Sequence, residues 1–226
     1  MKVPTRSVPL KGVRGMIADK MVESLQTAAQ LTHHGSADAG ALLAEKARLA
    51  GAGTKASVED LLMLAVVRAL KKHPEINARV EGRVVQIFDS IDLSIAIALP
   101  GNVLVAPAID GAGEMDVAAL RAARQDLATR AKANKLSVSE MTGGTFCVSN
   151  LGLTRVEHFT PILNAPQIGL LGIGRLTDRA VRNDAGAVEL RPFVGLSLTF
   201  DHRAIDGAPA ADVLTTICEE IEGIGS

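Results

Sequence analysis

A short segment near the C-terminal end carries the strongest chemical signal in the chain: residues 201–207 read Asp-His-Arg-Ala-Ile-Asp-Gly. It directly follows residues 193–200, Phe-Val-Gly-Leu-Ser-Leu-Thr-Phe, whose apolar, β-branched and aromatic side chains predict a buried strand. The pKa of a free histidine side chain is about 6.5, so a histidine at a strand end can exchange protons near neutrality. His202 is therefore a candidate general base, with Asp206 close enough in sequence to hold the turn. A histidine that only caps the turn is the alternative at this point.

The elements that must position this segment follow from the apolar periodicity of the chain. Runs with helical spacing, one of them opened by a capping box of Ser57 with Asp60, alternate with runs typical of strands. Helices are predicted over residues 12–28, 39–49, 57–72, 116–135 and 210–222. Strands are predicted over residues 30–38, 79–81, 84–88, 93–99, 103–109, 145–150, 168–175 and 193–202. Without an internal repeat or a linker, this pattern predicts one α/β domain with a mixed sheet.

Composition excludes several classes of function. The chain has 226 residues, of which 47% are hydrophobic, enough for a substantial core. Its formal net charge of −1 and its lack of Trp and Tyr argue against nucleic acid and anionic membranes as partners. No apolar run reaches the roughly 18–20 residues of a spanning helix, and the N-terminus lacks a signal-peptide core. Because Cys147 and Cys218 show no metal or redox spacing, a reduced, cytoplasmic chain is expected.

Four segments resemble one enzyme family in the same order and spacing. His-x-x-x-Asp-Gly is the signature of coenzyme A-dependent acyltransferases. The longer form at 201–207 resembles the catalytic domain of the E2 component of 2-oxo acid dehydrogenase complexes, dihydrolipoamide acyltransferase. Residues 143–152, Gly-Gly-Thr-Phe-Cys-Val-Ser-Asn-Leu-Gly, and 159–167, Phe-Thr-Pro-Ile-Leu-Asn-Ala-Pro-Gln, resemble two further segments of that family, and residues 14–24 are similar to its first helix. The resemblance runs from about residue 8 to residue 222.

The resemblance implies a chloramphenicol acetyltransferase-like fold, a mixed β-sheet with flanking helices, with residues 1–226 forming a single catalytic domain. It implies transfer of an acyl group between a dihydrolipoyl thiol and coenzyme A, which are substrates of the reaction. Acetyl is the expected group, because the first hundred residues are nearest to pyruvate- or acetoin-type enzymes. Residues 29–31 read Ala-Gln-Leu where many family members have Pro-His-Phe, which leaves the acyl preference open.

The resemblance also implies roles for individual residues. His202 would be the general base that deprotonates a thiol, and the Ser149 hydroxyl would stabilise the tetrahedral oxyanion. In the family these two residues come from neighbouring chains of a trimer. Asp206 belongs to the catalytic motif and is expected to pair with Arg14 on the first helix, which would hold the turn that presents His202. Direct polarisation of His202 by Asp206 is the less favoured alternative. No metal site is expected.

Assembly and partners follow from the same resemblance. No lipoyl or subunit-binding domain is expected within the 226 residues, so the lipoyl arm would come from another domain or chain. The E1 and E3 components of a dehydrogenase complex are the expected partners. Residues 221–226, Ile-Glu-Gly-Ile-Gly-Ser, offer little apolar area where the family has a leucine-rich tail that docks into a neighbouring trimer. A homotrimer is therefore expected, with larger cores weak or absent.

Two other functions are alternatives to this one. A non-catalytic scaffold has no need of His202, Ser149, Asp206 and Arg14 together. A free-standing coenzyme A-dependent O- or N-acyltransferase shares His-x-x-x-Asp-Gly, but the segments at 143–152 and 159–167 look like the E2 branch.

Other tempting residues have simpler interpretations. His33 and His34 are adjacent in a predicted strand and should face opposite sides of the sheet, which argues against a metal pair. His73 and His158 are interpreted as structural. Residues 169–174, Gly-Leu-Leu-Gly-Ile-Gly, lack the spacing of a nucleotide motif and predict a glycine-rich core strand.

Overall fold

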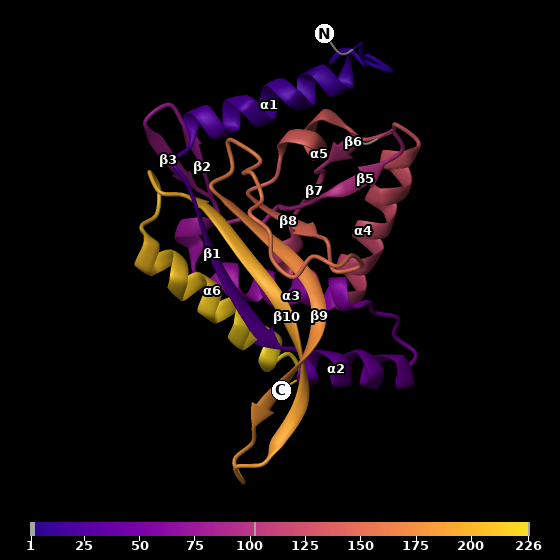
Figure 1. The fold of residues 1–226 in the computed structure, drawn as a ribbon, viewed down its shortest axis with the longest axis vertical. Coiled ribbons are helices and arrows are strands. Elements are labelled where there is room, and N and C mark those ends of the chain that lie inside the picture. The colour runs from indigo at the N-terminus through magenta and orange to yellow at the C-terminus, as the bar shows by residue number, and fades with distance from the viewer. Residues whose placement is uncertain (1–2, 102, 226) are drawn as a thin grey trace.

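The computed structural model of the chain describes residues 3–101 and 103–225, and its centre is a six-stranded mixed sheet (Figure 1). In spatial order the strands are β1 (Gln30–Asp38), β10 (Val188–Asp201), β9 (Gly169–Arg182), β8 (Phe146–Asn150), β4 (Leu93–Ile95) and β7 (Ala108–Ile109). Strand β8 is parallel to both β4 and β9, and the other neighbours are antiparallel. Two small hairpins complete the strands: β2 (Ala78–Glu81) with β3 (Val84–Ile87), and β5 (Ile97–Leu99) with β6 (Val103–Val105). The predicted α/β class and mixed sheet are confirmed.

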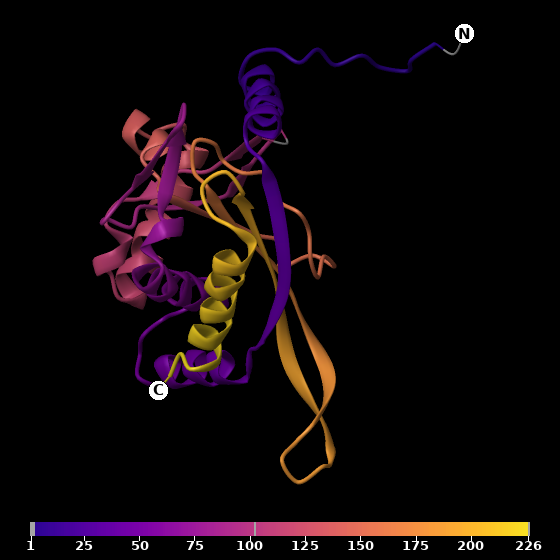
Figure 2. The same cartoon turned by 90° about the vertical axis from the view of Figure 1, so that its left-hand side faces the viewer.

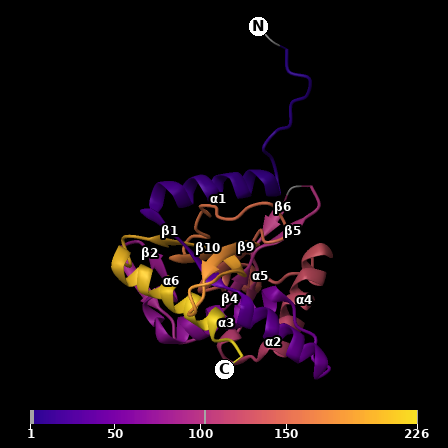
Figure 3. The ribbon, with the colours of Figure 1, turned by 60° about the horizontal axis from the view of Figure 1, so that its bottom comes forward.

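The helices that pack on the sheet lie on one side of it (Figure 2). They are α2 (Gly40–Gly51), α3 (Val58–Lys72), α4 (Val117–Lys132) and α6 (Gly207–Glu222), with the short α5 (Val138–Thr142) and the 3₁₀ turns η1 (Pro74–Ile76) and η2 (Ala112–Glu114) in the connections. Helix α1 (Val13–Thr27) is placed differently: it crosses one end of the sheet, and the segment before it extends away from the body (Figure 3).

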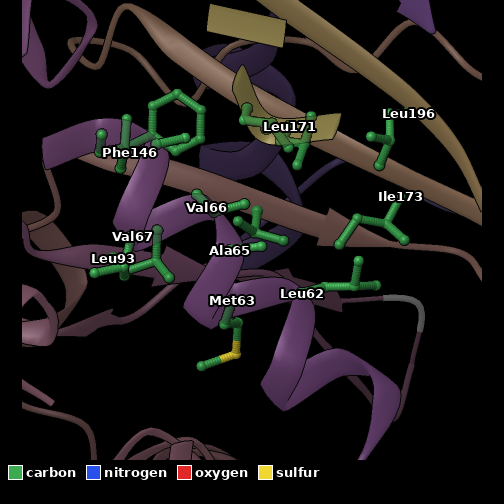
Figure 4. Packing of buried hydrophobic residues seen from close by; sticks show 14 of the residues in the cluster. Leu62, Met63, Ala65, Val66, Val67, Leu93, Phe146, Leu171, Ile173 and Leu196 are labelled. Atoms are coloured by element: carbon green, nitrogen blue, oxygen red, sulfur yellow. The ribbon is translucent and has the colours of Figure 1, made fainter. Parts of the chain in front are cut away.

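Helix α3 forms the middle of the core because it is buried along most of its length. Its Leu62 and Val66 lie in one cluster with Phe146, Leu171 and Leu196 of the sheet (Figure 4). Burial of each such side chain contributes about 1.5–3 kcal/mol, so this helix fixes the strands that lead to the candidate site.

The opposite face of the sheet is covered by a loop, residues 151–168, instead of by helices. The glycines of the neighbouring strands make this possible. A Cβ on Gly174 or on Gly195 would overlap the Glu157 carbonyl, and a Cβ on Gly172 would meet the Phe159 ring. The segment 169–174 is therefore the core strand that the sequence predicts, and its glycines let the loop approach the sheet closely.

Most predicted elements are present within one to three residues of their predicted bounds. The capping box at the start of α3 is confirmed: Asp60 N donates to Ser57 Oγ, and Ser57 N donates to the Asp60 carboxylate. Helix α6 begins at Gly207, three residues earlier than predicted, because Pro209 fits a first helical turn, where no backbone N–H is required.

Two predicted strands are each divided in two. The sequence predicts continuous strands over 93–99 and 103–109, but the structure has β4 and β5 in the first range and β6 and β7 in the second. Strands β4 and β7 pair in the main sheet, whereas β5 and β6 form a separate hairpin. The division falls at Ala96, whose N–H donates to Val148 in the main sheet, and at Pro107, which has no N–H to continue a ladder.

The predicted strands 168–175 and 193–202 are also too short. Strands β9 and β10 continue to Arg182 and from Val188, and their outer halves form a hairpin that projects beyond the rest of the molecule (Figure 1). This part lacks the apolar pattern on which the prediction depended. Helix α5 was not predicted, although Ser137 and Glu140 form a capping box that marks its start.

Candidate active site

His202 lies in the turn between β10 and α6, with 44% of its side chain exposed. Its backbone N–H donates to the Ala29 carbonyl, 2.9 Å away, at the junction of α1 and β1. Its ring lies beside that of Phe200, with the ring centroids 5.9 Å apart. The predicted position at the end of a buried strand is therefore confirmed, and the ring is supported on one side and open to solvent elsewhere.

Asp206 is the charged group nearest to this ring among the ion pairs of the described residues. Its Oδ1 lies 3.6 Å from His202 Nδ1, which is longer than a hydrogen bond. The side chain is 83% exposed, so solvent screens its attraction for a protonated imidazole. Asp206 is therefore near His202 within the chain but is not hydrogen-bonded to its ring.

The predicted pair of Asp206 with Arg14 is not formed within the chain. Arg14 lies in the first turn of α1, where its Nη2 donates to the Gly101 carbonyl over 3.5 Å, in the turn between β5 and β6. The opposite end of α1 reaches the His202 turn through Ala29. A helix of this length rises about 20 Å, which keeps Arg14 far from Asp206 in the same chain.

Ser149 occupies the fourth position of β8 and is partly buried. Phe146 and Val148 belong to the main core, whereas Cys147 packs in a second small cluster on the other face. Because side chains alternate along a strand, Ser149 shares the face of Cys147, away from the helices. Its neighbour in the register is Gly172 of β9.

The strand register separates Ser149 from His202. Ser149 is opposite Gly172, which is opposite Ser197 of β10, so the two candidate residues lie five residues apart along the strand direction and two strands apart across the sheet. These offsets correspond to about 16 Å and about 10 Å, or about 19 Å in all. Groups that act on the same reacting atoms must lie about 3 Å from them, so these two side chains cannot serve one site within a single chain.

A group of polar side chains lies on the same face of the sheet as Ser149, at strands β1 and β10. His34 Nδ1 lies 2.9 Å from Ser197 Oγ, and His158 Nε2 donates to the Gly35 carbonyl over 2.9 Å. The His34 and His158 rings meet edge to face with centroids 5.5 Å apart. The sequence shows these residues individually but gives no register, so it cannot show that they lie near one another.

The other histidines are explained by packing. His33 Nε2 donates to the Gly207 carbonyl over 3.1 Å and its ring stacks on Phe200, on the face opposite His34, as predicted. His73 caps the C-terminal end of α3, and its Nε2 is hydrogen-bonded to Thr216 Oγ1 of α6 over 2.8 Å. Within the residues that the structure describes, no group of three His, Cys, Asp or Glu side chains is placed to hold a metal ion.

A cavity of about 540 Å³ lies behind the His202 turn, between α1, the β2–β3 hairpin and the loop before β9. Two cationic side chains, Lys20 and Arg203, and two carboxylates, Glu23 and Asp201, line it together with apolar and amide groups. Arg203 and Asp201 are paired with each other, and Lys20 donates to Asn164 over 2.7 Å. Three segments that are distant in sequence therefore meet around the residues that flank His202.

Neither cysteine offers a nucleophile to the site. Burial raises the pKa of Cys147 to about 12 and, with nearby carboxylates, the pKa of Cys218 to about 11, so both thiols are protonated at neutral pH. Both cysteines are free. Among the described helices, none is long and apolar enough to cross a membrane.

Comparison with known sequences gives relatives that are acyltransferase components. The chain is 37% identical over 222 residues to the acetyltransferase component of the acetoin cleaving system of Bacillus subtilis, covering 96% of this chain and 55% of that protein. It is 35% identical to the succinyltransferase component of the Bacillus subtilis 2-oxoglutarate dehydrogenase complex, over 92% of this chain and 51% of that protein. The chain thus spans about half the length of these relatives.

Solved structures agree at the level of the fold. A probable dihydrolipoamide acetyltransferase from Listeria monocytogenes superposes with a TM-score of 0.90 at 30% identity, covering 97% of this chain and 95% of that one. The dihydrolipoamide acetyltransferase of Azotobacter vinelandii gives 0.89 at 30% identity, covering 98% and 93%. A chloramphenicol acetyltransferase, at 18% identity and a TM-score of 0.56, shares the fold over 91% and 92% of the two chains, which confirms the predicted fold type.

The Azotobacter structure comes from a study of a serine, a histidine and an asparagine in the catalytic mechanism of that enzyme. In that enzyme the asparagine follows the histidine at the same spacing at which Asp206 follows His202 here. The serine precedes the histidine by nearly the same number of residues as Ser149 precedes His202. The model of one family, 2-oxoacid dehydrogenases acyltransferase (catalytic domain), matches residues 2–225. Sequence, fold and family match agree, and the chain belongs to the 2-oxoacid dehydrogenases acyltransferase family, of which it contains the catalytic domain.

Proposed function

We propose that this chain transfers an acyl group between a dihydrolipoyl thiol and coenzyme A, at a site that two chains of a homotrimer build together. The observation that carries the proposal is the placement of His202 and Ser149. Each lies at a partly exposed position suited to its role, yet the strand register keeps the two about 19 Å apart in one chain. A neighbouring chain resolves this, with His202 supplied by one protomer and Ser149 by the next.

Helix α1 supports the presence of a neighbour. Of its fifteen residues only Ser24 is buried, and apolar side chains at Val13, Met16, Val22 and Leu25 are more than half exposed. An isolated fifteen-residue helix is marginal in water and depends on packing for stability. A second copy of the chain that covers this apolar surface would supply that packing.

In the proposed reaction His202 Nε2 accepts the proton of the attacking thiol, because Nδ1 is turned toward Asp206. The thiolate adds to the thioester carbonyl, and the Ser149 hydroxyl of the neighbouring chain donates a hydrogen bond to the oxyanion that forms. Collapse of the tetrahedral species expels the second thiolate, which takes the proton back from His202. The net change is the exchange of one thioester for another, with no gain or loss of electrons or protons.

We propose acetyl as the acyl group, supported by the similarity to the acetyltransferase component of an acetoin cleaving system. A succinyltransferase component of comparable identity makes succinyl-CoA the necessary comparison. The lipoyl arm would be supplied by another domain or chain, the E1 and E3 components would be partners, and the cytoplasm is the proposed compartment.

The first experiment measures acetyl transfer from acetyl-CoA to free dihydrolipoamide. His202→Ala is expected to lower turnover by about 10²–10⁴-fold, because the general base is lost. Ser149→Ala is expected to lower it by about 10²–10³-fold, because an oxyanion donor is lost. No transfer by the native trimer with acetyl-, propionyl-, isobutyryl- or succinyl-CoA would contradict the proposed reaction.

A mixing experiment tests the shared site. Chains with His202→Ala and chains with Ser149→Ala are co-expressed and the mixed trimers are compared with trimers of each variant alone. Random assembly in a closed trimer gives about a quarter of the sites an intact histidine from one chain and an intact serine from the next. Mixed trimers no more active than the separate variants would show that the site does not combine these residues across chains.

A further inference from the structure

The residue before His202, Asp201, has a buried carboxylate with several hydrogen-bond donors. The Asp201 carboxylate is 3% exposed, and its Oδ1 accepts hydrogen bonds from the backbone N–H of Ala29 at 3.2 Å and of Arg203 at 3.1 Å. The Arg203 guanidinium donates to both carboxylate oxygens through Nε and to Oδ2 through Nη2. This is a bidentate arginine–carboxylate pair with two further backbone donors.

These contacts fix the backbone on both sides of His202. On one side, His202 N–H donates to the Ala29 carbonyl, and the Asp201 carboxylate accepts from Ala29 N–H. Two hydrogen bonds of opposite direction therefore join this segment to the α1–β1 junction. On the other side, the N–H groups of Ala204 and Ile205 donate to the Asp201 carbonyl, at 2.9 Å and 3.2 Å. The backbone at His202 is therefore held by hydrogen bonds on both sides.

The pair persists throughout the neutral range. Burial alone would raise the pKa of Asp201, but hydrogen bonds from the side chain and backbone of Arg203, with a smaller contribution from Ala29, lower it below the ordinary value. The carboxylate is therefore ionised, and Arg203 keeps its partner, at any pH at which a histidine base would work.

We propose that Asp201 and Arg203 are the positioning residues for His202, the part that the sequence resemblance assigns to Asp206 and Arg14. The inference depends on the proposed function for its kinetic consequence. Asp206 is exposed and beyond hydrogen-bond distance of the ring, and Arg14 lies at the far end of α1. Asp201 instead holds the segment that carries His202 against the start of β1.

The test compares native trimer with Asp201→Asn. Asparagine keeps an oxygen for the backbone donors but places an amide against the guanidinium, which loosens the turn. A misplacement of about 1 Å in a catalytic group can cost about 10²-fold, so kcat is expected to fall by about that factor while KM for both substrates stays within about twofold. Arg203→Gln should give a similar loss, and the double variant no more than either alone, since both act through one pair.

Asp60 provides a matched control. It is a fully buried carboxylate, paired with Arg121 and Arg124 at 3.0 Å and 2.8 Å, and it lies on α3, away from the candidate site. Asp60→Asn is expected to lower the melting temperature while leaving kcat unchanged. A loss of kcat in Asp201→Asn no larger than that in Asp60→Asn, with both trimeric, would overturn the assignment.

A second readout does not depend on activity. The chain has five histidines, so the ring signals of isotope-labelled histidine can be assigned by single substitutions. The His202 signal is expected to broaden or divide in Asp201→Asn and to stay single in Asp60→Asn. An unchanged His202 signal would contradict the positioning role. If the native trimer transfers no acyl group, the proposed function fails and this signal alone decides the positioning role.

Discussion

Around His202 the distances separate two kinds of neighbour. Asp201 is bound to the turn through several hydrogen bonds, whereas Asp206 lies 3.6 Å from the ring and is largely in solvent. The buried carboxylate of Asp201 therefore holds the turn more strongly than the exposed carboxylate of Asp206, although both belong to the motif.

This difference predicts a mild effect of Asp206→Asn. An exposed charge beyond hydrogen-bond distance contributes little, and asparagine keeps the polar group at the start of α6. Turnover of acetyl transfer is expected to stay within about tenfold of the native value, far above that of His202→Ala. The pH profile of kcat for the two proteins is the measurement. A loss as large as that of His202→Ala would mean that Asp206 acts directly on the ring in the assembled protein.

The residues of the site were predictable only in part. His202 could be found because a buried strand leads to it, and Ser149 because its segment resembles a family motif. The Arg14 pairing could not be judged from sequence, because it depends on which end of α1 meets the turn. The polar group of His34, Ser197 and His158 depends on strand register, which separate segments of one sequence do not specify.

At the scale of elements, local signals were reliable and long-range pairing was not. The capping box of Ser57 with Asp60 fixes the start of α3 from within a few residues. The segments 93–99 and 103–109 look continuous, yet they divide because their halves pair in different sheets. The outer hairpin of β9 and β10 has no buried face, so periodicity could not reveal it.

The close contact of the 151–168 loop with the sheet predicts that Gly174→Ala destabilises the protein. The new Cβ would overlap the Glu157 carbonyl, and a forced backbone shift of this kind costs about 1–3 kcal/mol. Thermal unfolding measures the loss. Gly51→Ala is the control, because nothing lies within 4 Å of its added Cβ and it ends a helix, where alanine is favoured. Equal melting temperatures for the two variants would contradict the contact.

For the whole molecule, the exposed apolar side chains of α1 predict where assembly can be broken. Met16 and Leu25 lie on opposite sides of the helix, so replacing both by Glu places charge on two sides of α1. This double substitution is expected to reduce the sedimentation mass from three chains toward one, at 23.6 kDa each. Activity should fall with the trimer. Val138→Glu is the control, since Val138 is exposed on α5, at a helix start where an acid is favoured. A trimer that survives the double substitution would show that α1 does not form the interface.

Ile224 bears on larger assemblies. Its side chain is 4% exposed and belongs to the main core of its own chain, as does Ile221. Both side chains are therefore packed within their own chain. The same sedimentation experiment measures whether trimers associate further.

The distance between Ser149 and His202 also has a consequence for the life of the protein in the cell. If the two must come from different chains, then a newly synthesised chain is complete in fold but chemically silent. It would consume no acyl thioester until it has found its neighbours. The number of active sites then depends on how many chains have assembled, and the reaction begins only where the assembly already exists.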